Sequence, residues 1–160
     1  MDELRAWLAK SAIAELITRY ASLLDAGDWD AVAALYTEDG RMSRPTAPDD
    51  FIAGRSAILA SFKARPPRTT RHIIANVLVA LDGEALATAT SQILLYTGGG
   101  NPGGLPLLFT AAPLIGSYRD RLVCTELGWR FAERRGSLDF RSVPRSQRHC
   151  ECEQSHGGDE

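Results

Sequence analysis

The chain has 160 residues, of which 44% are hydrophobic and 24% charged, and its formal net charge is −2. These values are typical of one globular domain with a substantial core. They leave no basic face for nucleic acid, and no apolar run approaches the roughly 20 residues that span a bilayer. The acidic, amphipathic start MDELRAWLAK is not typical of a signal peptide, so we expect a cytoplasmic protein without a membrane or nucleic-acid partner.

The first part of the chain predicts helices. Apolar residues recur at helical spacing over residues 2–25, and Ala26-Gly27 is expected to end this helix. Asp28 is suited to cap a second helix over residues 29–36. The next stretch, TEDGRMSRPTAPDD, is rich in proline and aspartate, which indicates a turn, a short strand and a loop.

A third short helix is predicted over residues 54–64, before two consecutive prolines. From residue 70 the hydrophobic period changes to two, which predicts strands. Asp82-Gly83 is typical of a tight hairpin turn. The glycine-rich segment 98–104 lacks the following helix of a phosphate-binding loop, so we interpret it as a hairpin or pocket-rim loop. The expected strands are 70–81, 84–97, 106–124 and 128–142.

Helices followed by a four-stranded antiparallel meander indicate an α+β fold, with the helices on one face of a curved sheet. We expect one domain over residues 1–143 and a disordered polar tail over 144–160, which lacks Leu, Ile, Val and Phe. The three cysteines do not form a disulfide framework. The tail holds four residues of metal-ligand type at a spacing that matches no zinc pattern, so no metal or cofactor is expected. They are His149, Cys150, Cys152 and His156.

The expected strand 70–81 carries polar residues on one side. Under strict alternation, Thr70, His72, Ile74 and Asn76 share that side, which we expect to face the helices and a cavity. The other side is wholly apolar and needs a cover of its own. A sister subunit is the simplest cover, which indicates a homo-oligomer.

Four residues are candidates for chemistry, and each has a plainer alternative. His72 is either a base or a packed core histidine. Asp25 is unfavourable at a helix C-terminus, and its alternative role is an exposed turn residue. Tyr20 lies on the apolar stripe of the first helix, where its hydroxyl needs a partner or the ring simply packs. Arg134 either enters the site or lies at a solvated strand edge.

Further residues are candidates for lining a substrate pocket. Tyr118 alternates with Leu114 and Leu122 and is expected to point inward. Its neighbours Arg119 to Arg121, including Asp120, are expected to point outward. The substrate-binding candidates are Trp29, Phe51, Asn76, Tyr96, Phe109 and Tyr118.

Four stretches together resemble the SnoaL-like group of the nuclear transport factor 2-like (NTF2-like) superfamily, over about residues 4–142. The resemblance implies a cone-shaped α+β barrel, with three N-terminal helices on a curved, mainly antiparallel sheet around a deep pocket. Function varies widely on this scaffold, so individual residues must decide it. The stretches are AIAELITRYASLLDAGDWDAVAALYTEDG, GRSAILASF, TRHIIANVLV and GSYRDRLVCTELGWRFAERR.

Two branches of the superfamily are relevant. Members similar to ketosteroid isomerase carry a tyrosine that Tyr20 matches, but Arg44 stands where their base precedes the proline. The branch with scytalone dehydratase, bile-acid 7α-dehydratase and hexachlorocyclohexane dehydrochlorinase uses an aspartate and a histidine, which Asp25 and His72 match. Arg134 resembles an arginine of the dehydrochlorinase. This branch favours trimers, with a dimer as the alternative.

The resemblance implies a cofactor-independent lyase or isomerase, with a dehydratase favoured, that acts on a hydrophobic polyketide-, steroid- or terpenoid-like molecule. A neutral His72 would take a proton from carbon, Asp25 would hold its tautomer, and Tyr20 would donate to developing charge, with Arg134 or Asn76 assisting.

Two other kinds of function remain open. One is a polyketide cyclase or an epoxide hydrolase, and the other is a non-catalytic binding or structural subunit, such as the β-subunit of ring-hydroxylating dioxygenases. An enzyme requires Tyr20, Asp25 and His72 to converge within hydrogen-bond reach in an open cavity of roughly 300 Å³ or more, with Asp25 in contact with His72. A structural subunit would have that cavity filled.

Overall fold

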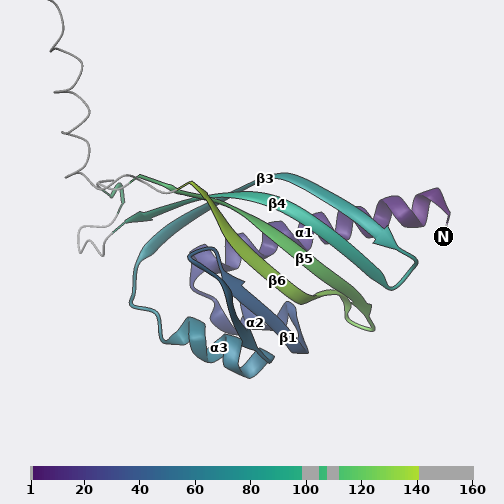
Figure 1. Cartoon of the computed structure of the whole chain (residues 1–160), viewed down its shortest axis with the longest axis horizontal. Helices are drawn as coiled ribbons and strands as arrows, with labels where there is room; N and C mark the ends of the chain where they lie inside the picture. Colours follow the sequence, from purple (N-terminus) through teal and green to yellow (C-terminus); the bar gives the residue numbers. More distant parts are fainter. Residues whose placement is uncertain (1, 99–104, 108–111, 141–160) are drawn as a thin grey trace, which may run out of the picture.

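The computed structural model describes residues 2–98, 105–107 and 112–140 (Figure 1). The predicted helices are confirmed, with slightly different ends. Within the described residues no helix is long and apolar enough to cross a membrane. The elements are α1 (Glu3–Ala26), α2 (Trp29–Ala34), β1 (Tyr36–Arg44), β2 (Ala47–Ala53), α3 (Arg55–Lys63), β3 (Thr69–Asp82), β4 (Leu86–Gly98), β5 (Leu114–Thr125) and β6 (Gly128–Phe140).

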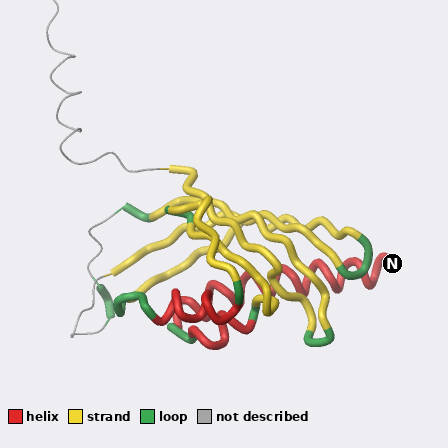
Figure 2. The backbone as a smooth tube through the Cα atoms, turned by 60° about the horizontal axis from the view of Figure 1, so that its bottom comes forward, coloured by secondary structure: helices red, strands yellow, loops and turns green. Residues whose placement is uncertain are grey.

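The strands form one six-stranded sheet in the order β2-β1-β6-β5-β4-β3. β1 is parallel to β6, and every other neighbouring pair is antiparallel. Figures 1 and 2 show a strongly curved sheet with α1 running along its concave side and α2 and α3 beside the β1–β2 hairpin. The α+β class and the mainly antiparallel sheet are therefore as predicted, and the sheet stays open instead of closing into a barrel.

The helix ends follow from local chemistry. Asp2 caps α1 by accepting from the Arg5 amide at 2.7 Å, and Gly27 ends it in the left-handed conformation, with φ 71°. Asp28 caps α2 by accepting from the Ala31 amide at 3.1 Å. The cap at Gly27 ends the last turn of α1, which carries Asp25.

The prediction for residues 37–50 was wrong in detail, because the stretch forms a strand hairpin. β1 enters the sheet beside β6, and β2 is the edge strand. The proline-rich composition concealed β2, since an edge strand tolerates Pro48 without losing an inner hydrogen bond. The third expected strand also began too early, because Leu105 and Pro106 lie in a bend and β5 starts at Leu114.

Strict alternation along β3 was also wrong. Its pairing with β4 shifts between Ala75 and Leu78, and Asn76 has a φ of 50°. This bulge inserts one residue and reverses the sides that follow. Val77 and Val79 therefore pack against the core, whereas Leu78 is 72% exposed on the outer face.

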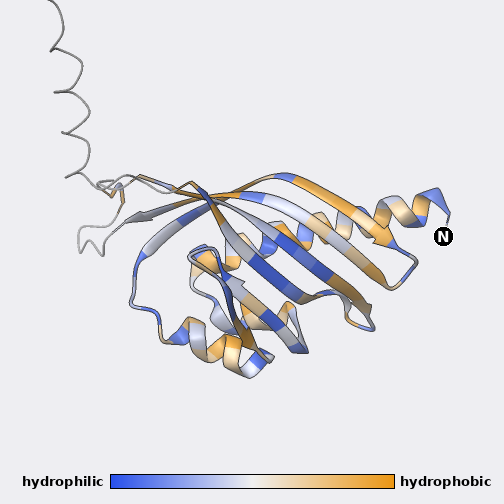
Figure 3. Cartoon of the chain, viewed as in Figure 1, coloured by the Kyte–Doolittle hydropathy of each residue, from blue (hydrophilic) through white to orange (hydrophobic). Residues whose placement is uncertain are grey.

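The core fills the space between α1 and the concave face of the sheet. Figure 3 shows apolar residues along the helices but hydrophilic stretches within β5 and β6. Two charged residues of these strands, Asp120 and Arg134, are nevertheless buried. The core therefore contains a polar region close to the site. The largest core side chains include Ile13, Ile17, Tyr36, Ile58, Phe62 and Phe131.

Candidate active site

Asp25 and His72 are joined by two hydrogen bonds. The backbone amide of His72 donates to Oδ2 of Asp25 at 2.8 Å, and Nδ1 of His72 lies 2.5 Å from Oδ1. The hydroxyl of Thr70 donates to the same Oδ1 at 2.8 Å. The side chains of His72 and Asp25 are 7% and 15% exposed. These three hydrogen bonds join the last turn of α1 to the first residues of β3.

This arrangement determines which nitrogen of His72 is free. A carboxylate oxygen only accepts hydrogen bonds, so Nδ1 carries the proton that faces Asp25. Nε2 has no hydrogen-bond partner among the described residues and keeps its lone pair. Burial lowers the pKa of His72, whereas the hydrogen bond and charge of Asp25 act in the opposite direction. Because burial is the largest effect, the imidazole is neutral at neutral pH and able to accept a proton.

His72 forms part of the wall of a cavity of about 430 Å³. The cavity lies between α1, the ends of β1 and β3, and the inner faces of β4 and β5. It is large enough for a small organic molecule. Its wall comprises Tyr20, Leu24, Met42, Ser43, Arg44, Pro45, Thr46, Arg65, Pro66, Arg68, His72, Ile93, Leu95, Thr97, Ala112, Leu114 and Tyr118.

Tyr20 and Tyr118 stand together in this wall, with ring centroids 6.4 Å apart in an edge-on arrangement. Tyr118 points inward, as its alternation with Leu114 and Leu122 predicts. Burial raises the pKa of Tyr118 well above its ordinary value, so its hydroxyl stays protonated and can donate a hydrogen bond.

Arg134 lies behind these tyrosines and does not line the cavity. Its guanidinium carbon is 4.3 Å from the ring centre of Tyr20, 4.0 Å from that of Tyr118 and 4.6 Å from that of Phe131. The side chain is 1% exposed. Arg134 therefore supports the rings that form the wall, through cation–π contacts.

Asp120 points inward, which corrects the expectation that it faces solvent. It alternates with Tyr118 and Leu122, and all three are buried. Its Oδ2 lies 3.5 Å from Nη1 of Arg134, and neither side chain makes a hydrogen bond within the described residues. Burial raises the pKa of Asp120 to about 6, and the charge of Arg134 limits the rise.

Two of the other pocket candidates lie on the outer face of the sheet. Asn76 is exposed and donates to Oε1 of Gln92 at 2.5 Å. Its predicted position beside His72 was wrong, because the bulge turns it outward. Tyr96 falls between Leu95 and Thr97, which line the cavity, and so lies on the opposite side of β4.

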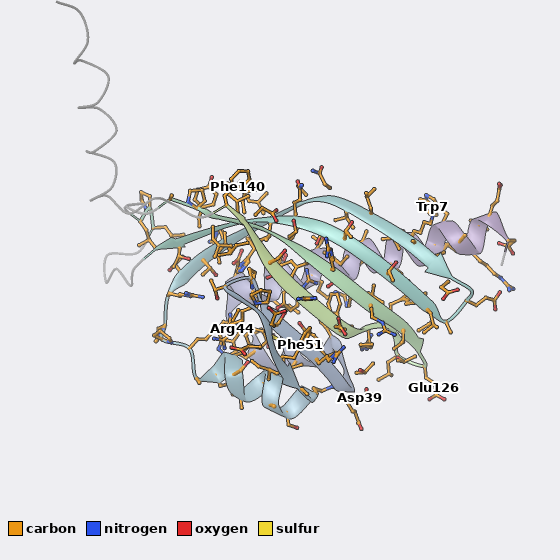
Figure 4. All side chains as sticks on the ribbon, in the orientation of Figure 1. Trp7, Asp39, Arg44, Phe51, Glu126 and Phe140 are labelled. Carbon is orange, nitrogen blue, oxygen red and sulfur yellow. The ribbon has the colours of Figure 1, made fainter. Side chains whose placement is uncertain are left out.

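The remaining pocket candidates lie at other places. Trp29 stacks on Phe62 at 5.8 Å and lines a second hollow of about 390 Å³, which shares His72 with the first. Phe51, labelled in Figure 4, lies on β2 beneath the guanidinium of Arg41 and outside the cavity. Phe109, the 99–104 part of the glycine-rich loop and the Cys/His tail lie outside the described residues.

Sequence reasoning missed four residues near His72. Thr70 is two positions away on the same strand face, and period-two alternation already placed it there. Arg65 and Arg68 flank the two prolines before β3, and Arg44 ends β1. Arg65 and Arg68 are already neighbours in the sequence, but only the folded chain brings Arg44 to them, so no short motif marks the cluster.

Residues 5–135 match the sequence model of the SnoaL-like domain. The chain belongs to the SnoaL-like family. Among proteins with curated descriptions, none matches the sequence of this SnoaL-like protein.

Solved structures agree with this assignment. An NTF2-like protein with a cystatin-like fold from Novosphingobium aromaticivorans is 26% identical, with a TM-score of 0.70 and 88% of each chain covered. A candidate scytalone dehydratase from the same organism is 22% identical, with a TM-score of 0.71, and the match covers 88% of this chain and 92% of that one. A Catenulispora acidiphila protein in complex with S-DNPA is 25% identical, with a TM-score of 0.63 and coverage of 81% and 92%.

Proposed function

We propose that this SnoaL-like protein is a cofactor-independent lyase or isomerase, and specifically a dehydratase, in which His72 is the base. The observation that carries this proposal is the 2.5 Å contact between Nδ1 of His72 and Asp25 beside an open cavity. It leaves Nε2 as the ring nitrogen free to take a proton. A substrate carbonyl with a hydroxyl on its β-carbon suits this site.

In the proposed reaction, Nε2 of His72 takes a proton from the carbon next to the carbonyl. The electron pair moves onto the carbonyl oxygen, and the hydroxyl of Tyr20 or Tyr118 donates a hydrogen bond to that oxygen. The enolate then re-forms the carbonyl and expels the β-hydroxyl. The imidazolium returns its proton to the leaving oxygen, so the products are water and an α,β-unsaturated carbonyl compound.

The substrate is proposed to be a largely apolar small molecule of polyketide, steroid or terpenoid type. Leu24, Met42, Ile93, Leu95 and Leu114 supply apolar cavity wall. The similar Catenulispora acidiphila protein is a small-molecule complex, which supports this use of the scaffold. A cyclase would use the same His72-generated enolate to attack a second carbonyl carbon, so its products distinguish it from a dehydratase.

A structural or binding subunit is the alternative from another class. A cavity of about 430 Å³ beside a neutral, hydrogen-bonded histidine supports a catalytic role over a structural or binding role. A subunit that uses the fold only for assembly has no need of a free Nε2 at an open cavity.

The test is a panel of cyclic β-hydroxy ketones, with dehydration followed by the ultraviolet absorbance of the enone and proton exchange followed by NMR in D2O. We expect His72→Gln to lower the rate by roughly 10²–10⁴-fold. Arg71→Gln is the matched control, because Arg71 is exposed on the opposite side of β3. Full activity in His72→Gln would contradict the role of His72, and a panel with neither dehydration nor exchange would contradict the reaction class.

A further inference from the structure

The cavity wall is strongly positive. Arg44, Arg65 and Arg68 line it together with His72, whereas its lining includes no aspartate or glutamate within the described residues. The three arginines come from the end of β1, the segment after α3 and the segment before β3. Arg44 and Arg65 are half-buried, and Arg68 is exposed at the rim. Two separate parts of the fold, the end of β1 and the connection between α3 and β3, thus place like charges around one space.

None of these arginines has a carboxylate partner in the described part of the chain. Several arginines elsewhere are paired with acids, as in Arg41 with Glu133, Arg134 with Asp120, and Arg135 with Asp49. The three arginines at the cavity face one space without an acidic counter-charge among the described residues.

The contacts of the half-buried pair show what is left unsatisfied. Arg44 donates from Nη2 to the backbone oxygen of Ser61 at 3.3 Å, and its buried Nε has no partner within the described residues. Arg65 lies over the ring of Phe62 at 4.3 Å. Figure 4 shows Arg44 on the β1–β2 hairpin, on the side of α3. Both guanidinium groups are positioned by neutral contacts, so their hydrogen-bonding capacity remains for a ligand.

The clustered charges disfavour one another in the empty cavity. Burial is the main cause that lowers the pKa of Arg65, and the charges of Arg44 and Arg68 act in the same direction, whereas Tyr20 opposes them. An anion placed among the three groups would relieve this repulsion, and a planar guanidinium matches a carboxylate through two parallel hydrogen bonds. The apolar wall beyond the arginines suits the hydrocarbon part of the same molecule.

We propose that Arg44, Arg65 and Arg68 form a subsite for the carboxylate of an amphiphilic organic acid. This inference rests on the proposed function in one respect only, namely that the acid is the substrate of His72. Bound there, the carboxylate lies at the arginine side of the cavity, and the apolar part extends along β4 and β5 towards the tyrosines. The subsite selects acids over the corresponding esters and alcohols.

Binding can be measured without knowing the reaction. The probes are 1-naphthaleneacetate, its uncharged methyl ester, inorganic phosphate and coenzyme A, each titrated into the full chain by calorimetry. We expect the acid to bind at least about tenfold more tightly than the ester, and Arg65→Gln or Arg68→Gln to remove most of this difference. Arg71→Gln removes the same charge from the outer side of β3 and leaves the difference intact.

The outcomes separate this proposal from the proposed function. We expect the His72→Gln variant to keep the preference for the acid, because His72 is not part of the arginine subsite. If the wild type prefers the acid but turns over no carbonyl substrate, the proposed reaction is contradicted and the subsite is not. Equal affinity for acid and ester overturns the subsite, as does binding of neither. Arginine-dependent binding of coenzyme A or phosphate but not of 1-naphthaleneacetate overturns the carboxylate assignment. Because Arg65 also packs on Phe62, the exposed Arg68 gives the variant that is safest for folding.

Discussion

Asp25 holds His72 at two points, the backbone amide and the ring nitrogen Nδ1. The carboxylate therefore fixes both the path of β3 and the orientation of the imidazole. Its unfavourable place at the C-terminus of α1 has a local explanation, because three donors from Thr70 and His72 surround it. Three hydrogen bonds to one carboxylate outweigh a helix-dipole effect of about 0.3–1 kcal/mol.

Asp25→Asn is expected to lower activity by about 10²–10⁴-fold while the fold persists. An asparagine can turn its amide group towards Nδ1, which favours the wrong tautomer and removes the lone pair from the cavity side. Turnover of a β-hydroxy ketone measures the effect, and circular dichroism reports the fold. Asp30→Asn is the control, since Asp30 pairs only with Lys63 at the surface. Equal losses in the two variants would show that the effect is not specific to His72.

The pH dependence of activity is expected to reflect a histidine that ionises below its ordinary range. Burial lowers the pKa of His72, and the charges of Arg65 and Arg68 act in the same direction. The base is active only when neutral, so kcat/KM rises with pH on the acid side and its midpoint lies below about 6.5. NMR titration of the His72 ring protons checks the assignment. A midpoint above 6.5 for the same group contradicts it.

An ion pair in the core is expected to make stability depend on pH in the opposite direction from a surface pair. Burial raises the pKa of Asp120 from its ordinary value to about 6. Between these values the folded protein holds a proton that the unfolded chain has lost, so this group stabilises the fold below pH 4, and the contribution is lost as the pH rises through about 6.

Asp120→Asn isolates this contribution. The free energy of unfolding of the wild type, measured by urea denaturation, should fall relative to that of the variant as pH rises from about 4 to 6.5. Asparagine resembles the protonated aspartic acid, so the two proteins should differ least near pH 4, where folded Asp120 holds its proton. Asp49→Asn is the surface control, because Asp49 pairs with Arg135 on the exposed side. If the difference in the free energy of unfolding between the wild type and Asp120→Asn does not change over this pH range, Asp120 is ionised throughout it.

The sequence allowed prediction of features that depend on local chemistry. The stop at Gly27 and the cap at Asp28 set the helix ends, and period-two alternation set the inward side of Tyr118. The contact of Asp25 with His72 was inferred through the family resemblance, because 47 residues separate them and neither spacing nor period connects them.

Other features depend on backbone detail or on the complete fold. The bulge at Asn76 moved that residue away from His72, and strict alternation takes no account of one inserted residue. The only local sign is the asparagine that interrupts the apolar run, since asparagine adopts a positive φ more readily than most residues. Alternation did place Asp120 on the same side as Tyr118, but its charge made an outward position the natural expectation. The arginine cluster requires the end of β1 to meet the connection between α3 and β3, which happens only after folding and which no local pattern contains.

The outer face of β3 leads to a prediction about assembly. Ile73 and Leu78 are 51% and 72% exposed there, which is unfavourable in an isolated chain. We propose that this face is covered by sister subunits in a homo-oligomer, with a trimer favoured over a dimer. Light scattering coupled to size-exclusion chromatography should give the mass of an oligomer for the wild type and a lower mass for Leu78→Lys.

Leu127→Lys is the matched control for that experiment. Leu127 is 79% exposed in the turn between β5 and β6, away from the face of β3. The same substitution there adds the same charge and removes a similar apolar area, so the oligomer should persist. Dissociation by Leu127→Lys but not by Leu78→Lys would move the interface to the β5–β6 turn. A monomeric wild type at all concentrations would show that the exposed leucine on β3 has no subunit to cover it.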